Sequence, residues 1–245
     1  MMEHTVQTMA QAARKAARQL AAVSIDTRNA ALLAIAEGIA NHQDEIMAAN
    51  RLDVAQATEE KLSTPLLNRL KVNETKCQRM IDGLHALARL PDPLGHVQYA
   101  KELSPGLNLY RVACPIGVIG VIFESRPDAL VQISSLCLKS GNACVLRGGK
   151  EAIRSSMAMV ESMRKALVAH GFSPDLIGLI TMTDRAGATA LMNMRGLVDV
   201  LIPRGGKGLI RAVVENATVP VIETGTGNCH VYVDASADLA MAVDI

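Results

Sequence analysis

An unbroken apolar run, Ile116–Phe123, constrains the fold of this 245-residue chain more than any other feature. A strand without polar alternation must be covered on both faces, which is typical of a parallel sheet between two layers of helices. Helical patterns follow this strand and alternate with further short apolar runs at 143–146, 176–181, 198–202, 219–222 and 230–233. This alternation predicts a doubly wound, mostly parallel, Rossmann-type α/β sheet.

The helices expected between these strands cover 128–140, 151–170, a stretch that Thr183 or Asp184 caps, 205–216, and a last one that starts at Ser236. The first third of the chain is also helical, because apolar residues recur there at helical spacing. Helices are expected at 6–20, 26–41 (with Asp26 as N-cap), 45–60 and 74–90, with a break at Pro65.

The segment 95–112 is short, mixes polar and apolar residues, and is interrupted by Ser104-Pro105-Gly106. It is expected to form a β-hairpin that turns at these three residues. The chain therefore divides into an N-terminal helical region at 1–94, a hairpin segment at 95–114 and an α/β domain at 115–245.

Composition excludes several function classes. A hydrophobic content of 49% excludes intrinsic disorder, and a net charge of +1 without charge runs argues against a nucleic-acid arm. Aromatic residues make up 2% of the chain and Trp is absent, so stacking platforms for single strands are not expected. No apolar run is long enough to span a membrane and no signal peptide is visible, so a cytoplasmic protein is expected. The five cysteines form no CxxC pair, and no metal site is expected.

Parallel sheets bind ligands at the carboxyl ends of their strands, so the loops 123–127, 147–150, 203–208 and 223–229 should share one edge. The cations and glycines of Arg204-Gly205-Gly206-Lys207 open a helix, which suits a pyrophosphate. Arg147-Gly148-Gly149-Lys150 suits a ribose that carries a 2′-phosphate. Flexible or solvated turns explain both loops as well.

The remaining edge residues leave alternatives open. Arg126 could hold an anionic substrate or pair with Glu124 or Asp128, and Ser125 could donate to an oxyanion. Glu223 could be a general base or cap a turn. Cys229 lies next to His230, but adjacent residues in a strand point to opposite faces, which favours a buried structural thiol.

Several long motifs occur in order: residues 115–127 (PIGVIGVIFESRP), 138–142 (LKSGN), 146–149 (LRGG), 202–211 (IPRGGKGLIR), 219–223 (VPVIE) and 227–234 (GNCHVYVD). Over essentially the whole chain they closely resemble the γ-glutamyl phosphate reductase family of the aldehyde dehydrogenase superfamily. The resemblance implies an oxidoreductase of proline biosynthesis that reduces L-glutamyl 5-phosphate with NADPH to glutamate 5-semialdehyde and phosphate. A cysteine thioester is the implied intermediate.

The resemblance also implies roles for individual residues. Around the cofactor NADP(H) it implies contacts from Arg147, Gly148, Gly149, Arg204, Gly205, Gly206 and Lys207. Ser125 matches the superfamily's oxyanion-hole asparagine and Glu223 its conserved glutamate, which makes both candidate catalytic residues. Glu124, Arg126 and Asn228 are expected to bind substrate. The hairpin resembles an oligomerisation segment, which implies a homo-oligomer, and contact with glutamate 5-kinase is a further family expectation.

One family motif is missing from the sequence. The nucleophile of the family lies in an Arg-Pro-Ser-Val-Cys-Asn type motif, which does not occur in residues 1–245. The last expected helix also has no terminating residue. We therefore expect the N-terminal part of a longer enzyme, without its catalytic domain and inactive alone. The alternatives are a non-catalytic nucleotide-binding or interaction module, or an aldehyde-oxidising relative, which the two Arg-Gly-Gly loops disfavour.

Overall fold

A four-stranded parallel sheet lies at the centre of the computed structural model, which describes residues 2–124, 126–223, 225 and 229–244. The strands are ordered β5-β4-β3-β6 and comprise β3 (Val118–Phe123), β4 (Ala143–Arg147), β5 (Ile177–Leu179) and β6 (Val200–Arg204). Every residue of β3 is buried, as the apolar run predicts. The predicted parallel α/β sheet is confirmed.

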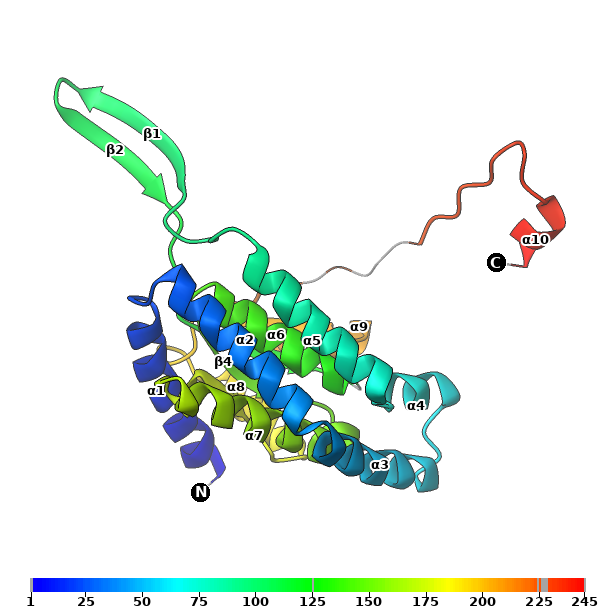
Figure 1. Ribbon diagram of the computed structural model, residues 1–245. Coiled ribbons are helices and arrows are strands. Elements are labelled where there is room, and N and C mark those ends of the chain that lie inside the picture. Colours follow the sequence, from blue (N-terminus) through cyan, green and yellow to red (C-terminus); the bar gives the residue numbers. More distant parts are fainter. Residues whose placement is uncertain (1, 125, 224, 226–228, 245) are drawn as a thin grey trace.

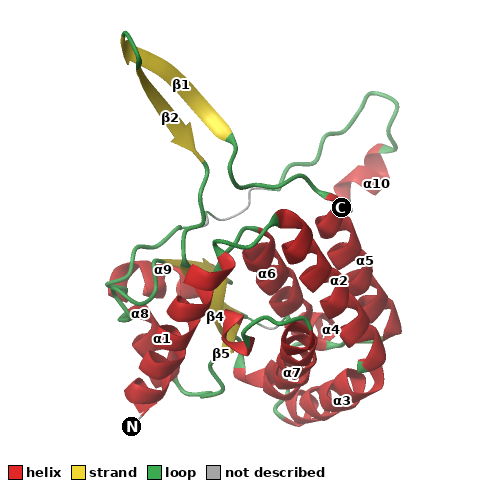
Figure 2. Ribbon diagram, turned by 60° about the vertical axis from the view of Figure 1, so that its left-hand side comes forward, coloured by secondary structure: helices red, strands yellow, loops and turns green. Residues whose placement is uncertain are grey.

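Helices cover both faces of this sheet (Figure 2). On one face lie α1 (Met2–Leu20), α8 (Arg185–Met192) and α9 (Lys207–Asn216). On the other lie α6 (Pro127–Lys139) and α7 (Ile153–Ala169). The sheet is therefore doubly wound, and α1 at the start of the chain belongs to its inner layers.

The other N-terminal helices form an outer layer over α6 and α7. This layer holds α2 (Ile25–Asn41), α3 (Gln43–Glu59) and α5 (Glu74–Arg89), with the short α4 (Thr64–Leu70) beside α3. Two expectations were wrong here. Ser24, and not Asp26, caps α2, because its hydroxyl accepts from the N–H of Thr27. Pro65 opens α4 instead of breaking the pattern, because proline is tolerated in the first helical turn.

β3 begins two residues later than the apolar run, and Gly117 is the reason. Gly117 has a φ of 125°, a backbone conformation that glycine adopts readily and other residues rarely do. A Cβ at this position would lie 2.2 Å from Oδ2 of Asp199. That same carboxylate oxygen accepts from the N–H of Val118 at 2.8 Å. Asp199 thus fixes where the central strand starts.

The expected strands after α9 form only in part. At 219–222 a single parallel bridge joins Val221 to Leu201, and the N–H of Leu201 donates to Pro220 O at 2.8 Å. Proline has no N–H to extend this ladder. The strand expected at 230–233 was wrong: among the described residues this segment pairs with no strand, and it runs away from the body towards α10 (Leu239–Val243), which Asp238 caps (Figure 1).

The predicted hairpin is confirmed and projects away from the rest of the molecule (Figure 1). It consists of β1 (Val97–Ser104) and β2 (Leu107–Val112), which pair antiparallel. The turn is shorter than expected, because Ser104 pairs with Leu107 and only Pro105 and Gly106 connect the strands. All residues of both strands are exposed. Among the described residues, no helix is long and apolar enough to cross a membrane.

Candidate functional site

A cleft of about 900 Å³ opens at the carboxyl edge of the sheet. Its floor is Ile122 at the end of β3, and its walls are the loop after β4, one face of α8 and one face of α9. Leu62 and Leu66, which flank the start of α4, also line it, a contribution that sequence reasoning missed. The cleft lies where a doubly wound sheet binds its ligand.

The two glycines after β4 are held tightly against neighbouring side chains. A Cβ on Gly148 would lie 3.1 Å from the Phe123 ring, so that ring packs closely against the loop. A Cβ on Gly149 would lie 2.1 Å from the Glu151 carboxylate. Both positions therefore favour glycine, because a larger residue would crowd Phe123 or Glu151.

Arg147 ends β4 and turns its guanidinium towards α8. Its Nη2 donates to the carbonyl oxygens of Thr183 and Asp184, each at 3.1 Å. Its Nε is buried, and no hydrogen-bond acceptor for it occurs in the described part of the chain. Arg147 thus lines the cleft and has an N–H donor that forms no hydrogen bond in the described part of the chain, which fits the binding of an anionic group.

The N-terminus of α9 is the second glycine turn. Gly206 is the N-cap, and as a glycine it has no side chain that could cap the helix. Its own N–H donates to Oε2 of Glu124 at 2.9 Å. A Cβ on Gly205 would lie 2.5 Å from the same oxygen. The structure therefore places the Glu124 carboxylate on the helix N-terminus, and its expected contact with substrate stays a prediction.

An arginine-rich pocket of about 310 Å³ adjoins the cleft, with Glu124 in the wall of both. Arg126 and Arg204 line it together with Arg69, which α4 supplies and sequence reasoning missed. The guanidinium of Arg126, which is exposed, lies 3.9 Å from the largely buried Asp128 carboxylate, a loose form of the ion pair considered as an alternative. Arg204, Gly205 and Gly206, all expected at the cofactor, line this pocket rather than the cleft.

Other expected site residues lie apart from the cleft. Lys207 and Glu223 line a separate hollow on another face of α9, together with Arg211 and Glu215. Ser125 and Asn228 lie outside the described residues. Their predicted roles, and that of Glu223, stay predictions.

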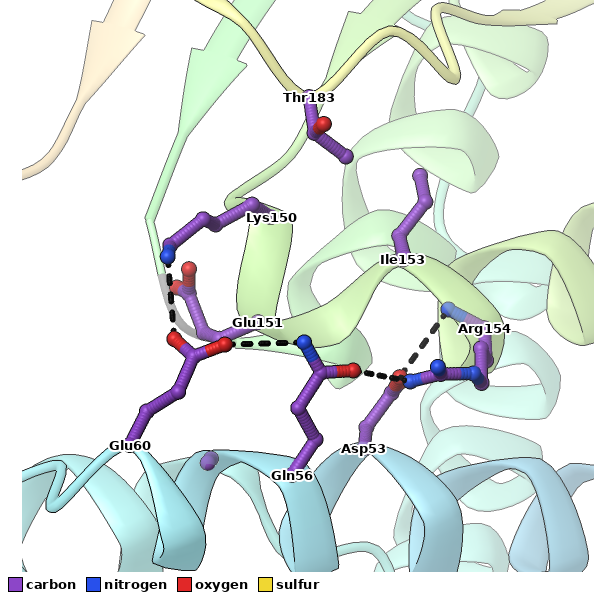
Figure 3. A pocket seen from close by; sticks show the side chains of 9 residues that line it. Asp53, Gln56, Glu60, Lys150, Glu151, Ile153, Arg154 and Thr183 are labelled. Carbon is purple, nitrogen blue, oxygen red and sulfur yellow. Dashed lines mark hydrogen bonds and ion pairs between the residues drawn. The ribbon is translucent and has the colours of Figure 1, made fainter.

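A smaller pocket of about 260 Å³ shares Lys150, Glu151 and Thr183 with the cleft (Figure 3). Lys150 lies 3.0 Å from the carboxylate of Glu60, which follows the end of α3. A hydrogen bond from Gln56 and the Lys150 ammonium together hold the pKa of the Glu60 carboxyl below its usual value. The second cation of the Arg-Gly-Gly-Lys loop is therefore held beside the cleft by an acidic partner.

Asp53 lies at the base of this pocket and caps α7 from another helix (Figure 3). Its side chain is 1% exposed, and its Oδ2 accepts from the N–H of Ser155 at 2.8 Å and the hydroxyl of Ser155 at 2.6 Å. Arg154 lies 3.3 Å from the other oxygen. Sequence reasoning missed this contact, because a lone Asp on a helix gives no signal of a partner about a hundred residues away.

The cysteines divide by exposure. Cys77, Cys137 and Cys144 are buried, whereas Cys114 and Cys229 are exposed. Burial raises the pKa of the Cys77 thiol, and a hydrogen bond with Cys144 together with burial raises that of Cys137. The expectation that Cys229 is buried was wrong, because the extended segment that carries it leaves the body.

The doubly wound sheet, the glycine turns and the cleft at the carboxyl edge together define a dinucleotide-binding α/β protein. The family model "Aldehyde dehydrogenase family" matches residues 1–245, so the chain belongs to this family. Membership implies a nicotinamide cofactor, and Arg147 fits its anionic groups, because the buried Nε of this arginine forms no hydrogen bond in the described part of the chain.

Similar proteins within the family indicate one particular group of enzymes. The chain is 51% identical over 237 residues to a γ-glutamyl phosphate reductase of Moorella thermoacetica, covering 97% of this chain and 57% of that protein. The crystal structure of γ-glutamyl phosphate reductase from Thermotoga maritima superposes with a TM-score of 0.88 at 40% identity, over 97% of this chain and 57% of that one. The crystal structure of γ-glutamyl phosphate reductase from Saccharomyces cerevisiae superposes with a TM-score of 0.83 at 34% identity, over 95% of this chain and 59% of that one. The chain thus spans somewhat more than half the length of these relatives.

Proposed function

We propose that the protein serves the NADPH-dependent reduction of L-glutamyl 5-phosphate to L-glutamate 5-semialdehyde and phosphate, a step of proline biosynthesis. The observation that carries this proposal is the similarity of nearly the whole chain to γ-glutamyl phosphate reductases. Residues 1–245 supply the cofactor cleft in this proposal.

The preference for NADPH is argued from charge. Arg147 and Lys150 flank the two glycines at one end of the cleft, and both are cations. A phosphate on the adenosine ribose would offer them an anionic acceptor that NADH lacks. The N-terminus of α9, about Gly205 and Gly206, would then receive the pyrophosphate in place of the Glu124 carboxylate, since the helix dipole and the N–H groups of the first turn favour an anion.

The arginine-rich pocket is the proposed place for the substrate's anionic end. L-Glutamyl 5-phosphate carries a carboxylate and an acyl phosphate, and planar guanidinium groups such as that of Arg126 bind such oxyanions through paired N–H donors. Because the pocket shares Glu124 with the cleft, substrate and cofactor would lie next to each other.

The proposed reaction begins with attack of a cysteine thiolate on the acyl carbon, which expels phosphate and leaves a thioester. A bound nicotinamide cofactor would supply the hydride that reduces this thioester to a hemithioacetal, whose collapse would release the aldehyde and regenerate the thiolate. We assign none of the five cysteines of this chain to the nucleophile, since none lies in the expected motif. A homo-oligomer joined through the β1–β2 hairpin and contact with glutamate 5-kinase belong to the same proposal.

The test is NADP⁺ reduction with pyrroline-5-carboxylate and phosphate, which runs the reaction backwards, alongside a binding titration with NADPH. This chain is expected to bind NADPH without turnover. Clear turnover would mean that a cysteine within residues 1–245 is the nucleophile, and Cys229 would be the first to replace because it is exposed. Substantial rates with simple aliphatic aldehydes would instead favour an aldehyde-oxidising enzyme.

A further inference from the structure

The carboxylate of Glu124 occupies the helix N-terminus that the proposed function reserves for the pyrophosphate. Its Oε2 lies 2.9 Å from the N–H of Gly206, the N-cap of the ten-residue helix α9. The main-chain N–H of Glu124 donates to Arg204 O at 3.3 Å, which anchors the residue beside the glycine turn. The close approach depends on Gly205, where a Cβ would lie 2.5 Å from the same carboxylate oxygen.

A carboxylate and a pyrophosphate cannot use this N–H together. Both are anions, both are attracted to the exposed N–H groups and positive dipole end of α9, and at such close range they would repel each other. A dinucleotide that enters the cleft must therefore displace Glu124 before its phosphates reach the helix. We propose that Glu124 is a built-in competitor of the cofactor's pyrophosphate and thereby sets the affinity of the cleft for the dinucleotide. This inference rests on the proposed function.

The displaced Glu124 carboxylate can pair with arginine side chains of the adjoining pocket. Glu124 lines the arginine-rich pocket as well as the cleft, and Arg69, Arg126 and Arg204 line that pocket. Gly205 and Gly206 line the same pocket, so a carboxylate displaced from the Gly206 N–H would still lie beside these guanidinium groups, which can accept its charge. Displacement therefore does not leave an unpaired anion.

The test is a fluorescence titration of NADPH into wild type, Glu124→Gln and Glu124→Ala at low ionic strength. Removing the competing charge should tighten binding about fivefold, as expected for a charge at a helix N-terminus. Glu215→Gln is the matched control, since it removes one carboxylate from the far end of the same helix, where Glu215 pairs with Arg211. Its NADPH affinity should equal that of wild type.

Adenosine 2′-monophosphate distinguishes binding of the 2′-phosphate from binding of the pyrophosphate, because it carries the first group and lacks the second. Its affinity should be the same in wild type and in both Glu124 variants. Unchanged or weaker NADPH binding in Glu124→Gln, with wild type binding normally, would overturn the inference and leave the proposed function standing. Absence of NADPH binding in wild type and in every variant would contradict both together.

Discussion

The ammonium of Lys150 lies 3.0 Å from the carboxylate of Glu60, so an ion pair connects the end of α3 to the loop after β4 (Figure 3). Both side chains are largely exposed, and ion pairs of this kind contribute little to stability. What the pair does is hold a cation where the small pocket and the cleft meet. A ligand phosphate that arrives there would compete with Glu60 for that cation.

Replacing Lys150 should therefore affect the two nicotinamide cofactors differently. Lys150→Gln is expected to weaken NADPH binding several-fold and to leave NADH binding unchanged, because only NADPH carries a 2′-phosphate. Dissociation constants from fluorescence titration give the comparison. Lys165→Gln is the control, since Lys165 forms a similar exposed ion pair with Glu161 on α7, away from the cleft. A parallel loss for both cofactors in Lys150→Gln would exclude a role at the 2′-phosphate.

Arg147→Ala should show the same selectivity more strongly. A hydrogen bond to a charged group is worth about 1.5–3 kcal/mol, so NADPH affinity should fall about tenfold or more, with a smaller effect on NADH. Because Arg147 also donates to the carbonyls of Thr183 and Asp184, the variant should lose some thermal stability. Isothermal titration with both cofactors at a temperature where the variant is folded separates the two effects. Equal losses for NADH and NADPH would make Arg147 purely structural.

Asp53 is expected to be the most important polar residue for the stability of α7. Asp53→Ala removes the acceptor of the buried N–H and hydroxyl of Ser155, and leaving such donors unpaired should cost about 2–4 kcal/mol of unfolding free energy. Urea unfolding followed by circular dichroism measures this cost. Asp82→Asn, at an exposed carboxylate of α5, should change stability by less than about 0.5 kcal/mol. Similar small effects in both variants would refute the capping role.

Two glycines should respond to alanine in opposite ways. A Cβ at Gly205 would lie 2.5 Å from the Glu124 carboxylate and 2.7 Å from Leu209, so Gly205→Ala should push the carboxylate away from Gly206 and lose about 1 kcal/mol of stability. Gly83→Ala in α5 meets no described atom within 4 Å and should gain about 0.5–1 kcal/mol. Thermal unfolding with and without NADPH checks both. Wild-type stability in Gly205→Ala would contradict the close packing of Glu124 and Leu209 against this turn.

The sequence predicted the sheet and the position of the cleft well, because their signals are local. The apolar run at 116–123 located β3 to within two residues, and glycines after successive strands marked the carboxyl edge. Contacts between distant segments had no such signal. The cap that Asp53 makes on Ser155 joins residues 102 apart, and Arg69 enters its pocket from a short helix that the pattern did not indicate.

The end of the chain was predicted less well for a related reason. Strand formation depends on a neighbour that supplies hydrogen bonds, and the β-rich composition of 230–233 cannot show whether one is present. Glu124 shows the same limit at the site: its position after β3 was evident, whereas its bond to Gly206 depends on how β6 and α9 are placed.

The most direct test of the central claim is a titration of NADPH and of NADH into this 245-residue chain, followed by fluorescence of the nicotinamide. The account predicts saturable binding of NADPH at one site per chain, at least about tenfold tighter than that of NADH, as one charge-assisted contact to the 2′-phosphate requires. Absence of NADPH binding, or equal affinity for the two cofactors, would contradict the assignment of the cleft.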